Sequence, residues 1–210
     1  MNQPTGQEDK VLSTEEKIKE AARKLFTQKG FAAVRTRDIA DEAGINLALL
    51  NYYFRSKQKL FDIIMLENFR KFLHIVSGRV LDDSLTLEEK IALLVDIEID
   101  MLTQNPDLPL FVLNEIRVNP NKIAMEMHSG DVPGVSRLLA QLISANGSGE
   151  APQMQPLHFL ANLIGLTVFP FVGRPMLQKI TGVDEDAFYK MMQERKKLIP
   201  IWIKAILNCS

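Results

Sequence analysis

Hydrophobic residues recur at helical spacing along most of the chain, and typical helix-ending residues interrupt them. Apolar side chains three and four positions apart fill residues 18–26, which is the period of an amphipathic helix. Ser13 and Glu16 have the spacing of a capping box in front of this run, and Gly30 follows it as a residue suited to a left-handed helix end. We therefore expect a first helix over residues 14–29.

Two short helices joined by a glycine turn are predicted next. Thr36 is a suitable N-cap for a helix over residues 37–43, and Asn46 is one for a helix over residues 47–54. Gly44 lies between them, where a tight turn needs a residue that tolerates positive φ. A short helix, a turn and a second short helix form the pattern of a helix-turn-helix, whose second helix enters DNA.

The rest of the chain keeps the helical period. Ser56 is placed to cap a long fourth helix, and Thr86 and Glu89 form a second capping box. Further helices are expected over residues 58–76, 87–103, 108–117, 121–128, 133–144, 155–172 and 184–207. We see no convincing strand, so the predicted fold class is all-α.

Charge and composition divide the chain into unequal parts. Residues 1–76 carry a net charge of +3 and residues 77–210 one of −4, as expected for a small nucleic-acid-binding module attached to another domain. We therefore predict a disordered tail over residues 1–12, a helix-turn-helix DNA-binding domain over residues 13–71, and a larger helical domain over residues 72–210.

Other chemistry is not indicated by the sequence. We find no glycine-rich phosphate loop, paired-histidine zinc motif or nucleophile elbow, so we expect no catalytic residues, metal ligands or cofactor. The single cysteine, Cys209, cannot form an intrachain disulfide, which suits a cytoplasmic protein. Residues 151–173 lack charged side chains, but their continuous apolar part is too short to span a membrane, so no membrane partner is expected.

The free face of the second short helix has side chains suited to bases. It presents Leu47, Ala48, Asn51 and Tyr52, with Leu49 and Tyr53 beside them. Apolar groups contact the methyl group of thymine, and asparagine can bind adenine through two hydrogen bonds. The alternative is an ordinary three-helix bundle in which Leu47 and Leu49 belong to the core.

At this point the sequence resembles a known family. The residues that carry the resemblance are Ala21-Ala22-x-x-Leu25-Phe26, Lys29-Gly30-Phe31, Thr36-x-x-Ile39-Ala40-x-x-Ala43-Gly44-Ile45 and Leu50-x-x-Tyr53-Phe54-x-Ser56-Lys57-x-x-Leu60. From about Ile18 to Ile64 the chain is similar to the N-terminal domain of the tetracycline-repressor (TetR) family of bacterial transcriptional regulators, without gaps.

The resemblance implies which residues bind DNA. Together with the residue chemistry it gives the set Arg35, Thr36, Arg37, Asn46, Leu47, Ala48, Leu49, Asn51, Tyr52, Tyr53 and Lys57. Thr36, Arg37, Tyr53 and Lys57 are expected on phosphates. The sequence departs from the family at Leu47, which is often polar or basic there, and at Asn51, which is commonly tyrosine. We therefore expect specificity that depends on A·T pairs.

The resemblance also implies a helical ligand-binding and dimerising domain from about Phe72 onward. Two predicted helices, over residues 155–172 and 184–207, resemble the pair that builds the family's dimer interface. The residues expected there are Leu160, Ile164, Val168, Met191, Leu198 and Trp202. The alternative is that these side chains form core within one chain.

A ligand pocket is expected among the middle helices. Its candidate residues are Phe72, Met101, Phe111, Asn114, Glu115 and Arg117. Polar residues within an apolar stretch need partners when they are buried, and a ligand can be such a partner. Each of these residues also fits an ordinary core or surface position.

These features predict a dimeric regulator that binds double-stranded operator DNA. It is expected to act as a repressor that an unknown small-molecule effector releases. The alternative is a helical enzyme or small-molecule carrier whose N-terminal bundle is only structural.

Overall fold

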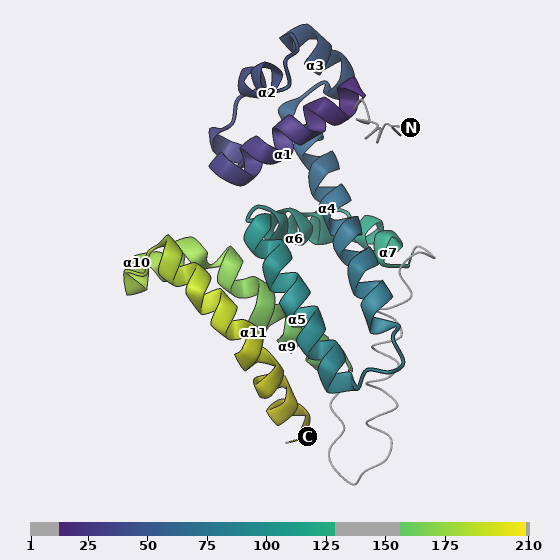
Figure 1. Cartoon of the computed structure of the whole chain (residues 1–210), viewed down its shortest axis with the longest axis vertical. Helices are drawn as coiled ribbons and strands as arrows, with labels where there is room; N and C mark the ends of the chain where they lie inside the picture. Colours follow the sequence, from purple (N-terminus) through teal and green to yellow (C-terminus); the bar gives the residue numbers. More distant parts are fainter. Residues whose placement is uncertain (1–12, 129–155, 209–210) are drawn as a thin grey trace, which may run out of the picture. The chain divides into compact units, whose positions relative to one another are not determined.

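The computed structural model describes residues 13–128 and 156–208, and every regular element in these ranges is an α-helix (Figure 1). The chain divides into two compact units between Ile64 and Met65. The helices are α1 (Thr14–Ala33), α2 (Thr36–Glu42), α3 (Leu47–Phe54), α4 (Lys57–Val80), α5 (Leu87–Gln104), α6 (Leu108–Val118), α7 (Pro120–His128), α9 (Pro156–Val172), α10 (Arg174–Thr181) and α11 (Glu185–Asn208). The all-α prediction is confirmed.

Local capping explains where the first helices begin. The Ser13 hydroxyl accepts a hydrogen bond from the backbone N–H of Glu16 at 3.2 Å, as the sequence predicted for α1. Gly30 has φ +74° and breaks the helical geometry of α1, and one further turn follows it. The N-cap of α2 is Arg35, whose backbone N–H donates to the Asp38 carboxylate at 2.8 Å. The prediction that Thr36 is the N-cap of this helix was therefore wrong by one residue. The hydrogen bond at the helix start is accepted by the side chain of Asp38, inside the helix, and not by a side chain at the N-cap.

The turn between α2 and α3 has the predicted chemistry. Gly44 adopts φ +67°, a conformation that costs a side-chain-bearing residue energy. Asn46 is the N-cap of α3, and its side-chain oxygen accepts a hydrogen bond from the Leu49 N–H at 2.8 Å. Gly44 thus forms the turn after α2, and Asn46 defines where α3 begins.

A shared core stabilises the N-terminal unit. Its buried side chains include Ile18, Ala22, Leu25, Phe26, Val34, Ile39, Leu50, Phe54 and Leu60. The rings of Phe26, Phe31 and Phe61 pack against one another, with centroids 4.5 to 5.8 Å apart. Full burial of one leucine or phenylalanine contributes about 1.5–3 kcal/mol, so this core can hold helices too short to form alone.

Lys57, the first residue of α4, ties the start of α4 to the end of α1. Its ammonium group donates to the carbonyl oxygens of Phe31 and Val34, each at 2.8 Å. It also lies 4.1 Å from the centre of the Phe31 ring. Carbonyls at a helix end lack intrahelical partners, and Lys57 supplies them.

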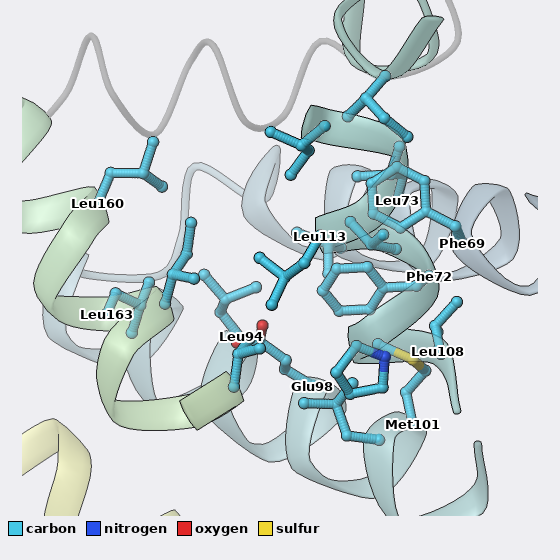
Figure 2. A pocket seen from close by; sticks show the side chains of 18 of the residues that line it. Phe69, Phe72, Leu73, Leu94, Glu98, Met101, Leu108, Leu113, Leu160 and Leu163 are labelled. Atoms are coloured by element: carbon cyan, nitrogen blue, oxygen red, sulfur yellow. The ribbon is translucent and has the colours of Figure 1, made fainter. Parts of the chain in front are cut away.

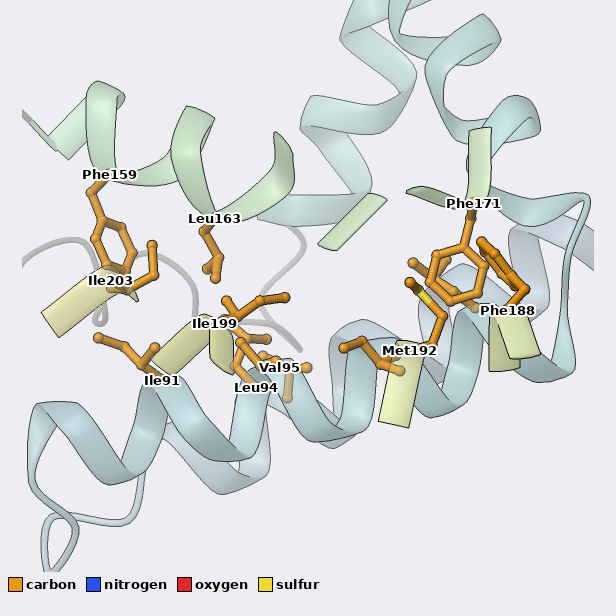
Figure 3. Packing of buried hydrophobic residues seen from close by; sticks show 13 residues of the cluster. Ile91, Leu94, Val95, Phe159, Leu163, Phe171, Phe188, Met192, Ile199 and Ile203 are labelled. Carbon is orange, nitrogen blue, oxygen red and sulfur yellow. The ribbon is translucent and has the colours of Figure 1, made fainter. Parts of the chain in front are cut away.

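The second unit has a core formed mainly by α5, α9 and α11. Figure 3 shows Val95 and Ile91 of α5, Leu163 of α9 and Ile199 and Met192 of α11 directed toward this core. Helix α5 begins at the predicted capping box, in which Thr86 and Glu89 exchange hydrogen bonds.

The structure adds one element in this unit that the sequence did not predict. Helix α10 lies between Gly173 and Gly182, and Gly182 ends it in the left-handed conformation at φ +72°. Two prolines, Pro170 and Pro200, lie inside helices α9 and α11. The predicted tail over residues 1–12 and the predicted helix over 133–144 lie outside the described residues.

The apolar content and length of the described helices bear on membrane spanning. None of them is by itself long and apolar enough to cross a bilayer, and only α9 and α10 meet the criterion jointly, with a bend of 67° between them.

Replacing Lys57 with methionine tests its structural role. Methionine keeps an apolar side chain but removes the two bonds to the Phe31 and Val34 carbonyls, so we expect the N-terminal unit to lose about 1–3 kcal/mol of stability. Hydrogen exchange of the α1 and α2 amides measures the loss directly. Lys59, an exposed lysine two residues away, provides the control Lys59→Met, and equal effects of the two variants would contradict the role.

Candidate functional site

The exposed face of α3 is the first candidate site. Leu50 and Phe54 are buried in the core of the N-terminal unit, which fixes the rotation of the helix about its axis. The opposite face leaves Leu47, Ala48, Asn51 and Tyr52 in solvent, and Tyr52 has an exposed fraction of 80%. The four residues expected on the free face of this helix therefore lie together on its exposed surface.

The two tyrosines at the end of α3 contact each other edge to face. The ring centroids of Tyr52 and Tyr53 lie 5.5 Å apart, and their planes meet at 87°. Tyr53 is also exposed. Leu49 is half-buried, and the Asn46 side-chain oxygen is bound to the Leu49 N–H, so these two residues support the helix start.

Positively charged side chains lie at both ends of the α2–α3 segment. Arg35 and Arg37 are exposed at the start of α2, and Thr36 between them is half-buried. Arg55 is exposed directly after α3, and its N–H closes the helix on the Asn51 carbonyl at 2.9 Å. Arg55 was not among the predicted DNA-binding residues, although its position after the aromatic end of the helix was a usable signal.

Lys57 differs from the other predicted phosphate-binding residues. It is half-buried, and two of its N–H groups serve the Phe31 and Val34 carbonyls. Its contact with DNA stays a prediction, and the structure gives it a structural role in addition.

A second candidate site is an apolar cavity of about 180 Å³ within the C-terminal unit. Helices α4, α5, α6 and α9 supply most of its walls. Figure 2 shows that the lining residues include Phe69, Phe72, Leu94, Met101, Leu160 and Leu163.

Two of the six residues predicted for a ligand pocket line this cavity, namely Phe72 and Met101. The residues of α6 that line it are Leu108, Pro109, Val112, Leu113 and Ile116. Phe111, Asn114, Glu115 and Arg117 are not among the lining residues. The spacing of the α6 lining residues defines one helical stripe, and these four residues lie outside it.

The residues predicted for a dimer interface divide into two groups. Leu160, Ile164 and Val168 of α9 line the cavity. Met191 and Trp202 of α11 are half-buried and pack against the core, whereas Leu198 is 40% exposed.

Glu98 is a cavity residue that the sequence analysis did not identify. It has an exposed fraction of 9%, and burial raises the pKa of its carboxyl to about 7, against a smaller lowering by a hydrogen bond with Thr167. Glu98 lies four residues after Leu94 and four before Leu102, both buried. A carboxylate in the apolar stripe of α5 was the available signal.

The Thr167 hydroxyl links Glu98 to the backbone of α9. It also lies 2.9 Å from the Leu163 carbonyl, to which it can donate. A hydroxyl has one proton, so Thr167 either donates to Leu163 and accepts from a neutral Glu98, or donates to an ionised Glu98. The protonation of Glu98 is therefore coupled to a hydrogen bond of α9.

Within the ranges that the structure describes, no group of three or more histidine, cysteine or acidic side chains could hold a metal ion. The two candidate sites are the α3 face and the apolar cavity.

Comparisons with known proteins show which proteins the chain is similar to. Residues 18–64 match the model of the bacterial regulatory proteins of the tetR family. The chain is 29% identical over 204 residues to the Probable HTH-type transcriptional regulator YttP of Bacillus subtilis, covering 94% of this chain and 95% of that protein.

Solved structures agree in fold. A TetR/AcrR-family regulator from Thermobifida fusca superposes with a TM-score of 0.60 at 19% identity, covering 89% of this chain and 96% of that one. The TetR-family regulator PfmR from Thermus thermophilus gives 0.59 at 19% identity, covering 90% and 96%.

The match lies on the helices that carry the exposed α3 face, and the likeness to YttP extends over nearly the whole chain. Residues 18–64 therefore match the DNA-binding domain of the tetR family of bacterial regulatory proteins, and the chain as a whole is similar to a probable HTH-type transcriptional regulator.

Proposed function

We propose that the protein is a cytoplasmic homodimeric repressor that binds a near-palindromic operator and leaves it when a small molecule occupies the C-terminal cavity. The observation that carries this proposal is the α3 face. Core burial of Leu50 and Phe54 leaves Leu47, Asn51 and Tyr52 in solvent on one side of a capped helix. An exposed apolar and amide-bearing helix face needs a partner, and a base edge in the major groove is a suitable one.

Separate residues would position the protein and read the sequence. Arg35, Arg37 and Arg55 are exposed cations around the motif, suited to phosphates, which fix register without sequence information. Asn51 can bind adenine through two hydrogen bonds, and Leu47 can contact a thymine methyl. The α3 face thus favours an operator whose central contacts are A·T pairs.

Dimerisation is supported by an apolar stripe on α11. Met191, Leu198 and Trp202 lie along one side of this helix, and Leu198 is exposed. Helix α9 adds exposed apolar side chains at Ile164 and Phe169. A two-fold dimer would place two recognition helices in successive major grooves, about 34–36 Å apart.

The effector would act through the cavity. A ligand shifts a conformational equilibrium only when its affinity differs between the two states. The cavity would therefore bind its ligand more tightly in a geometry in which the two α3 helices do not match the groove spacing.

The direct experiment is a gel shift of the purified protein on the DNA upstream of its own gene, with salt varied. The proposal predicts that the logarithm of the binding constant falls linearly with the logarithm of the salt concentration, because binding releases counterions from the phosphates. A protein that binds this duplex no better than unrelated DNA would overturn the operator assignment.

Asn51 is expected to read sequence. Asn51→Ala should reduce discrimination between the operator and A·T-to-G·C variants by about 1–3 kcal/mol at particular base pairs. Arg37→Ala is the matched control, and it should weaken all duplexes alike and reduce the salt slope by about one. Fluorescence anisotropy on a set of operator variants distinguishes the two patterns, and equal weakening of all duplexes by Asn51→Ala would sink its reading role.

Leu198 is expected to lie in the dimer interface. A buried unpaired charge is strongly unfavourable, so Leu198→Glu should give monomers in light scattering coupled to size exclusion. Gln193→Glu introduces the same side chain on the polar side of α11 and should leave the dimer intact. A Leu198→Glu protein that stays dimeric would favour packing within one chain.

A further inference from the structure

The wall of the cavity has an unusual charge pattern. Among the described residues that line it, Glu98 alone carries an ionisable group. The others are hydrocarbon, apart from the thioether of Met101. A single carboxyl group in an otherwise apolar wall constrains the chemistry of an occupant more strongly than volume does.

Charged groups on the surrounding helices are engaged elsewhere or lie outside the lining. Lys196 of α11 binds Asp96 and Asp100 of α5, at 2.9 and 2.6 Å, and Arg195 donates to the Leu166 carbonyl at 2.7 Å. The ionisable side chains of α4, α6, α7 and α9 outside the lining include Glu67, Arg70, Lys71, His74, Arg79, Glu115, Arg117, Glu126 and His158. Burial raises the pKa of Glu98, and the Thr167 hydrogen bond opposes this rise.

These surroundings disfavour an anionic ligand. The described lining contains no lysine, arginine or histidine to meet a carboxylate or phosphate, and a buried charge without a partner is costly. An anion would in addition lie beside the Glu98 carboxyl, where like charges repel.

A cation would meet a complementary group at the same place. Glu98 is held at the cavity by α5, and its one described partner is the Thr167 hydroxyl. An ionised carboxylate has about four acceptor sites, so it can bind a ligand ammonium while keeping the Thr167 bond. Coulomb attraction is stronger in such an apolar site than in solution.

We propose that the cavity binds a small lipophilic cation, an alkyl- or arylammonium ion whose head pairs with the Glu98 carboxylate and whose hydrocarbon part packs against Phe72, Leu94 and Leu163. This inference rests on the proposed effector function of the cavity and specifies its ligand class. The volume of about 180 Å³ suits one short chain or one ring, since an apolar cavity of about 150 Å³ holds benzene.

The proposal fixes the sign of a pH effect. Glu98 must be ionised to pair with an ammonium ion, and the pKa of its carboxyl is about 7 in the folded protein. Affinity for an alkylammonium should therefore be full at pH 8 and fall about tenfold by pH 6, because binding then releases a proton. A neutral ligand of the same size needs no ionised Glu98 and should not weaken on acidification.

Hexylamine and hexan-1-ol differ only in their head group, and hexanoate, which also has six carbons, carries a head group of the opposite charge. We expect calorimetric titration of the full chain at pH 8 to show the amine binding at least about tenfold more tightly than the alcohol, with hexanoate weakest. Glu98→Gln keeps the side-chain shape and should remove the advantage of the amine together with its pH dependence. Glu115→Gln, outside the lining, is the control and should change neither.

Three outcomes would overturn the ligand class: equal affinity for amine and alcohol, tightest binding of hexanoate, or an amine affinity unchanged by Glu98→Gln. The comparison of the three ligands on the wild-type protein holds even if Glu98→Gln fails to fold.

Failure of the effector role can be distinguished from failure of the ligand class by a gel shift on upstream DNA. A protein that binds the amine through Glu98 but stays on DNA at saturating amine keeps the ligand chemistry and loses the proposed release mechanism.

Discussion

Burial of Leu50 and Phe54 is the constraint on which the DNA-binding surface depends. Helix α3 has eight residues, and a helix of that length is not stable alone in water. Packing against α2 and burial in the core of the N-terminal unit therefore both form the helix and set its rotation. The same packing exposes Leu47, Asn51 and Tyr52. Lys57 secures the arrangement by binding the carbonyls where α1 ends and α2 is about to begin.

Much of the N-terminal unit could be predicted because its signals are local. Asn46 caps α3 through an atom three residues away, and Gly44 meets a demand of the backbone alone. The hydrogen bonds of Lys57 to the end of α1 could not be predicted from local sequence, because its partners Phe31 and Val34 lie 26 and 23 residues earlier. The same limit explains Thr36, which resembles a cap, although the bond that starts α2 is made by Asp38.

The C-terminal unit was harder to predict because its site depends on how helices rotate against one another. Hydrophobic spacing located α5, α6 and α9, but it could not say which stripe of α6 faces the cavity, and Asn114, Glu115 and Arg117 fell outside it. The sequence prediction relied on the polar residues of α6. The polar residue that lines the cavity is Glu98, a single carboxyl group in the apolar stripe of α5. Burial of a carboxyl group with a raised pKa is energetically unfavourable, and such groups cluster at functional sites. A cationic ligand would supply the missing partner of Glu98.

Contact between the exposed face of α3 and DNA can be measured by hydroxyl-radical footprinting of the protein side chains. The chain has three tyrosines, two on α3 and one, Tyr189, on α11 in the other unit. With a saturating upstream duplex, we expect the oxidation of Tyr52 and Tyr53 to fall sharply while that of Tyr189 does not. Unchanged oxidation of Tyr52, which is 80% exposed in the free protein, would contradict it.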